Sequence, residues 1–515
     1  MQLPSNIVNS FFAPVQPDLL AGLIRSYNDD LANLKTVHAF MQHGDNKRAF
    51  NLFLESAGST VKRDVYDLEE TVKLLDAQYW NQALQLTDVF EHMPQARRDE
   101  WHEQVRERKC PTFEEDAVYT TIEQLLHNRS RYIAERVDGI FKGLSGEHVT
   151  NSPTGFRKRM IMANVVGDWA SVCYSKAGII DDLRKVIAKL LGRDETKTRF
   201  SNTKIARQYN YTGEWFDWDG GTLRVRVYKK GTVHLEIHPD IAWQLNQILA
   251  FLYPQALSHS SIRKPEKKSK DFNVINNPIS EKVLYELSRG KINGMEFEPN
   301  WDLKDKVIDI LCSVGGVRAK KERKARGYGE KTYMVDVVRF DYSPNEVITK
   351  IIVSGELPDK VTHQFYPTPE ELAAHVVTMA EIEGGHTVLE PSAGQGGLVD
   401  LVDAKHRIQC VEYSELHCEI LRAKGYEVER CDFLKYEEKL FDRIIMNPPF
   451  SEGRAKIHLE HAVGLLAEGG RLVAILPSGM TGKEIAGGVK VQYSDVLHNQ
   501  FPDARVSVVI CIVEK

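Results

Sequence analysis

Apolar residues recur at helical spacing along most of the N-terminal part of the chain. In residues 19–41, 69–90 and 113–141 they stand three or four positions apart with charged residues between them, which predicts amphipathic helices. A basic run at residues 157–159 indicates the solvated start of a further helix, with phosphate contact as the alternative. We therefore expect a mainly helical domain over residues 1–257.

The pattern changes within this domain, where apolar and polar residues begin to alternate strictly. Residues 223–238, LRVRVYKKGTVHLEIH, predict a β-hairpin that turns at residues 229–231. Arg224 and Arg226 fall on one face of its first strand, where they are placed to hold nucleic acid. An ordinary polar sheet face is the alternative interpretation.

The second strand of this hairpin raises the question of a metal site. His234, Glu236 and His238 share one of its faces, an arrangement that metal ligands can adopt. Alternation alone produces such triplets, so we predict no metal. The chain has 7 cysteines without a CxxC pair, which predicts neither a zinc ribbon nor a disulfide framework.

A polar, basic stretch then separates the first domain from the next. Residues 258–274 have the composition of an exposed linker, and residues 275–358 alternate helical and strand patterns, which predicts a small α+β domain. Between a predicted helix and a predicted strand lies the basic segment 317–331, VRAKKERKARGYGEK. We expect it to be a loop that contacts phosphate, and a purely solvated loop is the alternative. The residues expected to make that contact are Arg318, Lys320, Lys321, Arg323, Lys324 and Arg326.

The last third of the chain carries a strand, a glycine-rich turn and the start of a helix. In residues 387–402, TVLEPSAGQGGLVDLV, an apolar run ends at Glu390 and the glycines Gly394 and Gly396 follow. Glycine lets the backbone come close to a ligand, and the first amides of a helix favour polar or anionic groups. Such turns serve several nucleotide-binding folds, so the turn alone indicates a ligand loop without identifying the ligand.

Two further strand ends follow in order. The next apolar strand ends in Glu412, and an acidic residue at the tip of the second strand of a doubly wound sheet is placed to accept hydrogen bonds from a ribose diol. The turn Asp432-Phe433 offers a carboxylate and a ring that can hold an adenine by its amino group and its face. A later strand runs directly into the tetrapeptide NPPF, residues 447–450.

These segments together resemble the S-adenosylmethionine (SAM)-dependent methyltransferases that act on exocyclic nitrogens of adenine or cytosine. NPPF is similar to the catalytic motif of that family, EPSAGQG to its cofactor loop, and QFYPTPEELAAHVV (364–377) to the segment before the loop in DNA enzymes. The order, cofactor loop before catalytic motif, resembles the branch called gamma. Several matching elements in the expected order make the signal specific.

The resemblance implies a role for each matching residue. Asn447 and the carbonyl of Pro448 would accept the two N6 hydrogens of a target adenine, Pro449 would fix the backbone, and Phe450 would stack on the flipped base. The SAM site would be bordered by Phe365 and Thr368, with Glu390, Ser392, Gly394 and Gly396 at the methionine end, Glu412 at the ribose, and Asp432 and Phe433 at the adenine.

The expected fold is α/β. Residues 359–515 should form a Rossmann-like class I methyltransferase core with a seven-stranded, doubly wound sheet. The helical domain before it is similar to an uncharacterised domain of phages and mobile elements, which favours a phage or bacterial mobile-element origin. We expect the enzyme to be linked to restriction-modification or to protection from host defence. Because little chain follows the core, site recognition would come from residues 1–355, from short insertions such as residues 479–500, or from another subunit, either in a homo-oligomer or as a separate specificity partner.

The expected partner is double-stranded DNA with its target adenine flipped out, and the expected location is the cytoplasm. The net charge of -5 argues against nonspecific coating of nucleic acid, and the sequence has neither a signal-peptide pattern nor a membrane-spanning apolar run. Three alternatives remain open: an RNA adenine or guanine N-methyltransferase, cytosine N4 as the target, and a catalytically inactive nucleic-acid-binding or anti-defence protein.

Overall fold

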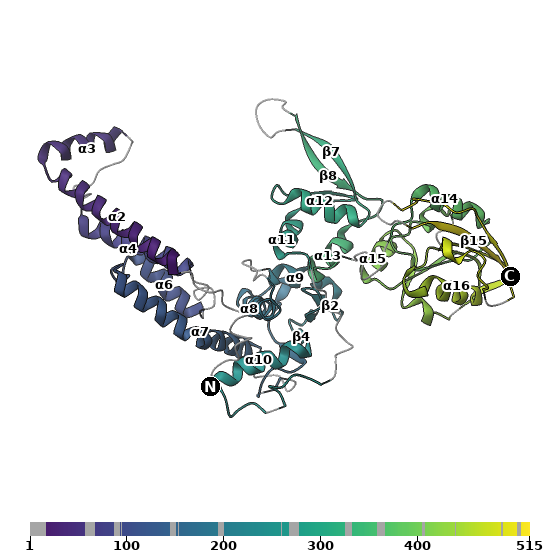
Figure 1. Ribbon diagram of the computed structural model, residues 1–515, viewed down its shortest axis with the longest axis horizontal. Coiled ribbons are helices and arrows are strands. Elements are labelled where there is room, and N and C mark those ends of the chain that lie inside the picture. The colour runs from purple at the N-terminus through teal and green to yellow at the C-terminus, as the bar shows by residue number, and fades with distance from the viewer. Residues whose placement is uncertain are drawn as a thin grey trace. The chain divides into compact units, whose positions relative to one another are not determined.

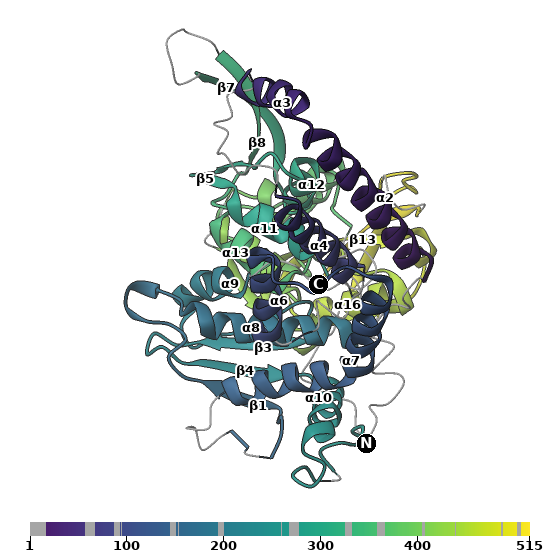
Figure 2. The ribbon, with the colours of Figure 1, turned by 90° about the vertical axis from the view of Figure 1, so that its left-hand side faces the viewer.

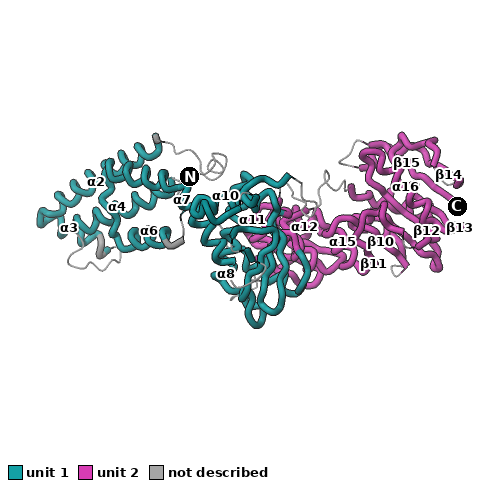
Figure 3. The backbone as a smooth tube through the Cα atoms, turned by 90° about the horizontal axis from the view of Figure 1, so that it is seen from below, with its two compact units in different colours: residues 1–215, 222–273 teal, residues 216–221, 274–515 magenta. Residues whose placement is uncertain are grey.

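The computed structural model divides the chain into two compact units (Figure 3). Unit 1 comprises residues 1–215 and 222–273, and unit 2 comprises residues 216–221 and 274–515. The structure describes residues 17–56, 67–86, 93, 95–144, 151–152, 154–193, 200–258, 260–266, 278–324, 332–357, 366–403, 407–437, 439–485, 488–501 and 506–515.

Unit 1 begins with amphipathic helices, as the sequence predicted (Figure 1). A buried carboxylate ties two of them to the chain that follows: Asp76 accepts hydrogen bonds from the hydroxyl of Tyr27 at 2.7 Å and from the backbone N–H of Phe113 at 2.9 Å. The helices are α2 (Pro17–Met41), α3 (Gly44–Ser56), α4 (Leu68–Gln85), α6 (Gln95–Glu107) and α7 (Glu115–Gly143).

A four-stranded sheet in the order β1-β4-β3-β2 follows, and the predicted hairpin is confirmed as β3 and β4. The basic run before residue 160 does not start a helix, because Arg159 begins β1 and pairs with β4. Figure 2 shows the sheet with its helices. The elements are β1 (Arg159–Met162), α8 (Tyr174–Leu190), α9 (Ser201–Gln208), β2 (Trp215–Trp218), β3 (Leu223–Val227), β4 (Val233–Ile237) and α10 (Pro239–Leu252).

The first part of unit 2 is an α+β arrangement with a sheet in the order β5-β6-β8-β7. The prediction of a basic loop was wrong for residues 317–324, which form strand β7 and pair in register with β8 from Val317↔Arg339 to Lys324↔Thr332. In Figure 1 this hairpin extends beyond α12. The elements are α11 (Glu281–Arg289), β5 (Lys291–Asn293), β6 (Glu296–Glu298), α12 (Lys304–Ser313), β7 (Val317–Lys324), β8 (Thr332–Arg339) and α13 (Asn345–Ser354).

The rest of unit 2 is built on a seven-stranded sheet in the order β11-β10-β9-β12-β13-β15-β14, which confirms the predicted strand number. The five strands from β11 to β13 run parallel, and β15 is antiparallel to both β13 and β14. The strands are β9 (Val388–Pro391), β10 (Ile408–Glu412), β11 (Glu427–Arg430), β12 (Phe441–Met446), β13 (Leu466–Pro477), β14 (Lys490–Tyr493) and β15 (Val508–Glu514).

Helices cover both faces of this sheet and create two apolar cores. One core packs α16 (Arg454–Gly464) against the strands, and the other packs α14 (Glu370–Met379) and part of α15 (Glu415–Ala423). Parallel strands buried on both faces require continuous apolar runs, and every residue of β10 is buried. Polar residues are therefore expected at the strand ends, where the candidate site lies.

Among the residues that the structure describes, no helix has both the length and the apolar character that a membrane span requires.

Candidate functional site

The candidate site lies where the strand order of the large sheet reverses direction. β9 is the first strand in sequence and pairs with β10 on one side and with β12 on the other. In open parallel sheets this switch point leaves a crevice outside the carboxyl ends of the strands, and ligands bind there. The glycine turn follows β9, and NPPF follows β12, so the two predicted motifs end at the same edge.

The turn after β9 adopts a backbone that favours glycine. Gly394 and Gly396 have φ angles of 55° and 90°, and a Cβ on Gly396 would lie 3.1 Å from Leu421 Cδ2. Ser392 also has a positive φ, 64°, which is unusual for a residue with a side chain. A residue held in this region is a strained feature of the kind found at ligand sites, and it supports the prediction of a close-approach loop.

Glu412 connects the glycine turn to the end of β10. Its Oε2 accepts from the N–H of Gly394 at 2.8 Å, and its Oε1 accepts from the N–H of Ser414 at 2.7 Å. The residue is 8% exposed. A carboxylate has about four acceptor positions, so these two hydrogen bonds leave capacity for a diol, and they fix where the carboxylate stands.

The NPPF motif contacts the segment that precedes α14. Asn447 Nδ2 donates a hydrogen bond to Thr368 Oγ1 at 3.1 Å, and both residues are half-buried. Thr368 also lies beside the glycine turn, since a Cβ on Gly397 would be 3.8 Å from Thr368 Cβ. The structure therefore brings together the three segments that the sequence assigned to one site.

The rest of the motif is held by packing. Pro448 is buried, and the half-buried ring of Phe450 packs against the cores on both sides of the sheet. After Phe450 the chain turns through Glu452 and Gly453, with φ angles of 54° and 73°, into α16. The motif thus has little freedom to move, while the Phe450 ring keeps an exposed part.

Glu390 has a structural partner in addition to its predicted cofactor role. Its Oε2 accepts from the N–H of Val399 at 3.1 Å and so caps the short helix η3 (Val399–Leu401). Burial raises the pKa of this carboxyl well above its usual range, and the Val399 N–H opposes that shift. The observed contact supports the helix cap that closes the glycine turn.

The third strand end shows a difference from prediction. Asp432 caps η5 (Phe433–Lys435), accepting from the N–H of Leu434 at 3.3 Å. The ring of Phe433, predicted to stack on adenine, is 3% exposed and packs on His461 at 4.8 Å between ring centroids. Phe433 therefore supports the site from the core and does not present a face. Burial also lowers the pKa of the adjacent His458 to about 4.

A lysine that the sequence did not single out braces the glycine turn. Lys424 Nζ lies 3.0 Å from the carbonyl oxygen of Gln395, 2.5 Å from Asp400 and 3.2 Å from Asp341. The Gln395 side chain in turn donates to the carbonyl of Ser313 at 2.8 Å. Asp341 and Ser313 belong to the α+β part of unit 2, so that part holds the glycine turn in place.

The basic segment of β7 is largely paired with carboxylates. Arg318 lies 3.1 Å from Asp305, and Lys321 lies 2.5 Å from Glu296. Arg323 pairs with Glu298, whereas Lys320 is exposed. These pairs weaken the case for phosphate contact along this strand. Phe365, Arg326 and the side chain of Lys324 lie outside the described residues.

The three residues weighed as a metal site, and not predicted to be one, make other contacts. Glu236 pairs with Arg159, the His234 ring packs on Tyr228 at 4.7 Å, and His238 Nδ1 accepts from the N–H of Asp240. Within the described ranges, no group of three or more His, Cys, Asp or Glu residues is placed to hold a metal ion.

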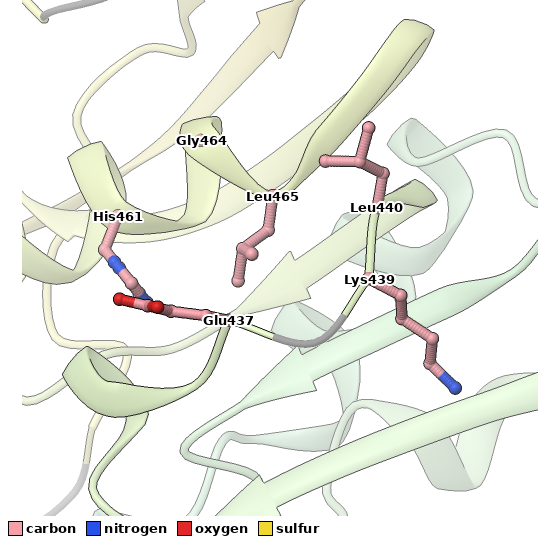
Figure 4. A pocket seen from close by; sticks show the side chains of 6 residues that line it. All are labelled: Glu437, Lys439, Leu440, His461, Gly464 and Leu465. Carbon is pink, nitrogen blue, oxygen red and sulfur yellow. The ribbon is translucent and has the colours of Figure 1, made fainter.

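A surface hollow of 420 Å³ lies at the other end of β12 (Figure 4). Lys439 and Leu440 line it and precede β12, whereas NPPF follows that strand. Glu437 and His461 lie close together at one side of it in Figure 4. Because it opens at the opposite edge of the sheet, this hollow is separate from the candidate site.

Comparison with protein families matches residues 72–255 to a domain of unknown function (DUF4942). The matched segment runs from within α4 to the end of α10 and lies outside the candidate site. It agrees with the uncharacterised domain expected for this region. A search of curated proteins finds no match.

Solved structures similar to part of the chain include TrmN from Thermus thermophilus, with 18% identity, a TM-score of 0.26, and coverage of 36% of this chain and 57% of that one. A dimethyladenosine transferase from Plasmodium falciparum has 17% identity, a TM-score of 0.25, and coverage of 29% and 63%. Magnesium protoporphyrin IX methyltransferase (ChlM) from Synechocystis with bound SAM has 12% identity, a TM-score of 0.23, and coverage of 28% and 79%. The chain spans less than two thirds of the first two of these structures.

Proposed function

We propose that the chain is a SAM-dependent methyltransferase that acts on the N6 amino group of adenine in DNA. The observation that carries the proposal is the hydrogen bond between Asn447 and Thr368 at the switch point of the sheet. This hydrogen bond holds the Asn447 amide in one orientation, beside a glycine turn whose backbone allows a ligand to come close. A methyltransferase of this kind would suit protection of phage or mobile-element DNA within a restriction-modification system.

The residues around the glycine turn fit SAM. Glu412 is anchored by two backbone amides and keeps acceptor capacity for the ribose hydroxyls. The positive φ angles at Ser392, Gly394 and Gly396 bring the backbone close to the space above β9. Asp432 follows the end of the next strand, β11, at the same edge of the sheet. There it can accept a hydrogen bond from the adenine amino group. When bound, SAM supplies a methyl group on a sulfonium centre.

The NPPF motif would activate the target nitrogen by accepting hydrogen bonds from its two N–H groups. With Asn447 Nδ2 held by Thr368, the Oδ1 of the same amide is directed to the other side, where it can accept one N6 hydrogen. The backbone carbonyl of Pro448 would accept the second. Two acceptors in fixed positions draw the nitrogen lone pair out of conjugation with the ring, which makes the amine a better nucleophile. The partly exposed face of Phe450 would stack on the flipped base.

Methyl transfer to different nucleic acids tests the proposal. The protein is incubated with methyl-labelled SAM and either unmethylated genomic DNA or total RNA, with Asn447→Ala as the inactive control. The proposal predicts label in DNA that Asn447→Ala abolishes. Label in RNA alone would make the enzyme an RNA methyltransferase. Cofactor binding without label in either substrate would support a binding protein.

A further inference from the structure

One face of the unit 1 sheet gathers three arginines around a single tryptophan. The guanidinium carbons of Arg159, Arg224 and Arg226 lie 5.4, 5.4 and 4.9 Å from the centroid of the Trp215 ring. All four residues fall within the segment that matches the domain of unknown function. Stacking on a ring fixes the plane of a guanidinium and leaves its N–H edges available for hydrogen bonds. We call this group the arginine cluster.

A buried carboxylate orients two members of the cluster. Glu236 Oε1 lies 2.6 Å from Arg159 Nη2, and Glu236 Oε2 lies 3.3 Å from Arg224 Nη1. The side chain of Glu236 is 3% exposed, whereas that of Arg159 is 52% exposed. Glu236 therefore fixes the two guanidinium groups from their buried side, whereas about half of the Arg159 side chain is exposed to solvent.

Arg226 has no such carboxylate. Its Nη1 donates to the hydroxyl of Tyr228 at 3.1 Å, and its Nε is buried without a hydrogen-bond partner. Among the described residues, none of the ion pairs involves Arg226. A partly buried cation that lacks a counter-charge is unfavourable, and two further guanidinium groups nearby increase the repulsion. An anion bound at the cluster would relieve both effects.

We propose that the arginine cluster binds a backbone phosphate of duplex DNA, with Arg226 as the central contact. The identity of the anion rests on the proposed function, in which DNA is the substrate. Guanidinium groups match phosphate oxygens in charge and in geometry. The guanidinium groups already lie over the Trp215 ring, so the cluster contacts phosphate and does not stack on a base. Such contacts hold DNA without reading its sequence.

Binding of a short fluorescein-labelled DNA duplex, followed by anisotropy across a range of salt concentrations, tests this site in the full chain. Arg226→Gln removes the central cation, and Lys230→Gln is the matched control because it removes an exposed positive charge from the turn of the same hairpin. We expect Arg226→Gln to raise Kd about threefold to tenfold and to reduce the slope of log Kd against log salt by about one. Lys230→Gln should bind like the wild type.

Equal affinities and equal salt slopes for Arg226→Gln and Lys230→Gln would overturn the proposal, as would preferential binding of an RNA hairpin of the same length. The melting temperature of each variant shows whether it is folded. If Arg226→Gln is unstable, Arg159→Gln replaces it, because that side chain lies largely in solvent. Binding is measured without methyl transfer, so the phosphate site and the proposed activity can fail separately. If Arg226→Gln loses affinity for DNA but the wild type methylates no DNA, only the proposed activity is refuted.

Discussion

Thr368 Oγ1 accepts a hydrogen bond from Asn447 Nδ2 at 3.1 Å, across 79 residues of sequence. The contact joins the segment before α14 to the NPPF motif after β12. It sets which atom of the Asn447 amide would face the proposed target base, since the Nδ2 atom donates to Thr368. The orientation of Asn447 Oδ1, the proposed acceptor, therefore depends on Thr368, which need not touch the base.

Replacing Thr368 tests this orientation. Thr368→Val keeps the shape and removes the hydroxyl, so the Asn447 amide is free to rotate, and kcat should fall about tenfold to a hundredfold. Thr368→Ser restores the acceptor and should remain close to the wild type. Steady-state kinetics with DNA separate kcat from the KM for SAM. A valine variant with wild-type kcat would show that Thr368 does not orient Asn447.

Glu412 should determine SAM affinity. Glu412→Gln places an amide NH2 where the carboxylate accepts from Gly394 and Ser414, so at least one hydrogen bond to the backbone is lost along with the charge. We expect Kd for S-adenosylhomocysteine to rise about tenfold to a hundredfold, which calorimetry would measure. Glu427→Gln, an exposed change on β11, is the control. Unchanged affinity in Glu412→Gln would remove this residue from the site.

Lys424 should couple the α+β part of unit 2 to the glycine turn. Lys424→Met leaves Asp400 without its cation and releases the Gln395 carbonyl, so the free energy of unfolding should fall by about 3 kcal/mol and SAM affinity should weaken. Lys424→Arg should recover part of both. Lys435→Met, which removes an exposed lysine, should change neither. A Lys424→Met protein that is less stable yet binds SAM normally would limit Lys424 to a role in folding.

Stability should depend on pH through Glu356. Burial, with smaller contributions from Asp217 and Glu415, raises the pKa of Glu356 from 4.5 to about 8. A raised pKa means that the folded state holds the proton more tightly, so this contribution is complete below pH 4.5 and is lost as the pH rises to about 8.

The free energy of unfolding of the wild type should therefore fall between these pH values, by an amount on the order of 2–4 kcal/mol. Glu356→Gln should remove that part of the pH dependence, and Glu346→Gln, an exposed change on α13, should retain it. Denaturant unfolding at pH values on either side of neutrality measures the difference. Equal pH dependence in wild type and Glu356→Gln would contradict the assignment.

The strand ends of the candidate site could be predicted from sequence because buried parallel strands are mostly apolar and polar residues gather where they end. Glu412 and Asn447 were placed in this way, and both lie at the expected edge. The glycine turn was equally visible, since closely spaced glycines indicate positive φ angles or close approach of the backbone, and Gly394 and Gly396 both have positive φ. The local pattern therefore located the site.

What could not be predicted are the contacts between segments distant in sequence. Gln395 and Ser313 are 82 residues apart, and a glutamine among glycines does not indicate its partner. Strand β7 was expected to be a loop because its charged residues occupy both faces, so no apolar alternation marks it. A single aromatic residue such as Phe433 has no periodicity, and only packing decides whether its ring is buried.

The central claim is methyl transfer to adenine N6 through Asn447, and the modified nucleoside tests it most directly. DNA is incubated with the protein and SAM carrying a deuterated methyl group, digested to nucleosides and analysed by mass spectrometry, with Asn447→Ala in parallel. The account predicts deuterated N6-methyladenine with the wild type and none with the variant. Deuterated N4-methylcytosine in place of N6-methyladenine, or equal label with Asn447→Ala, would contradict it.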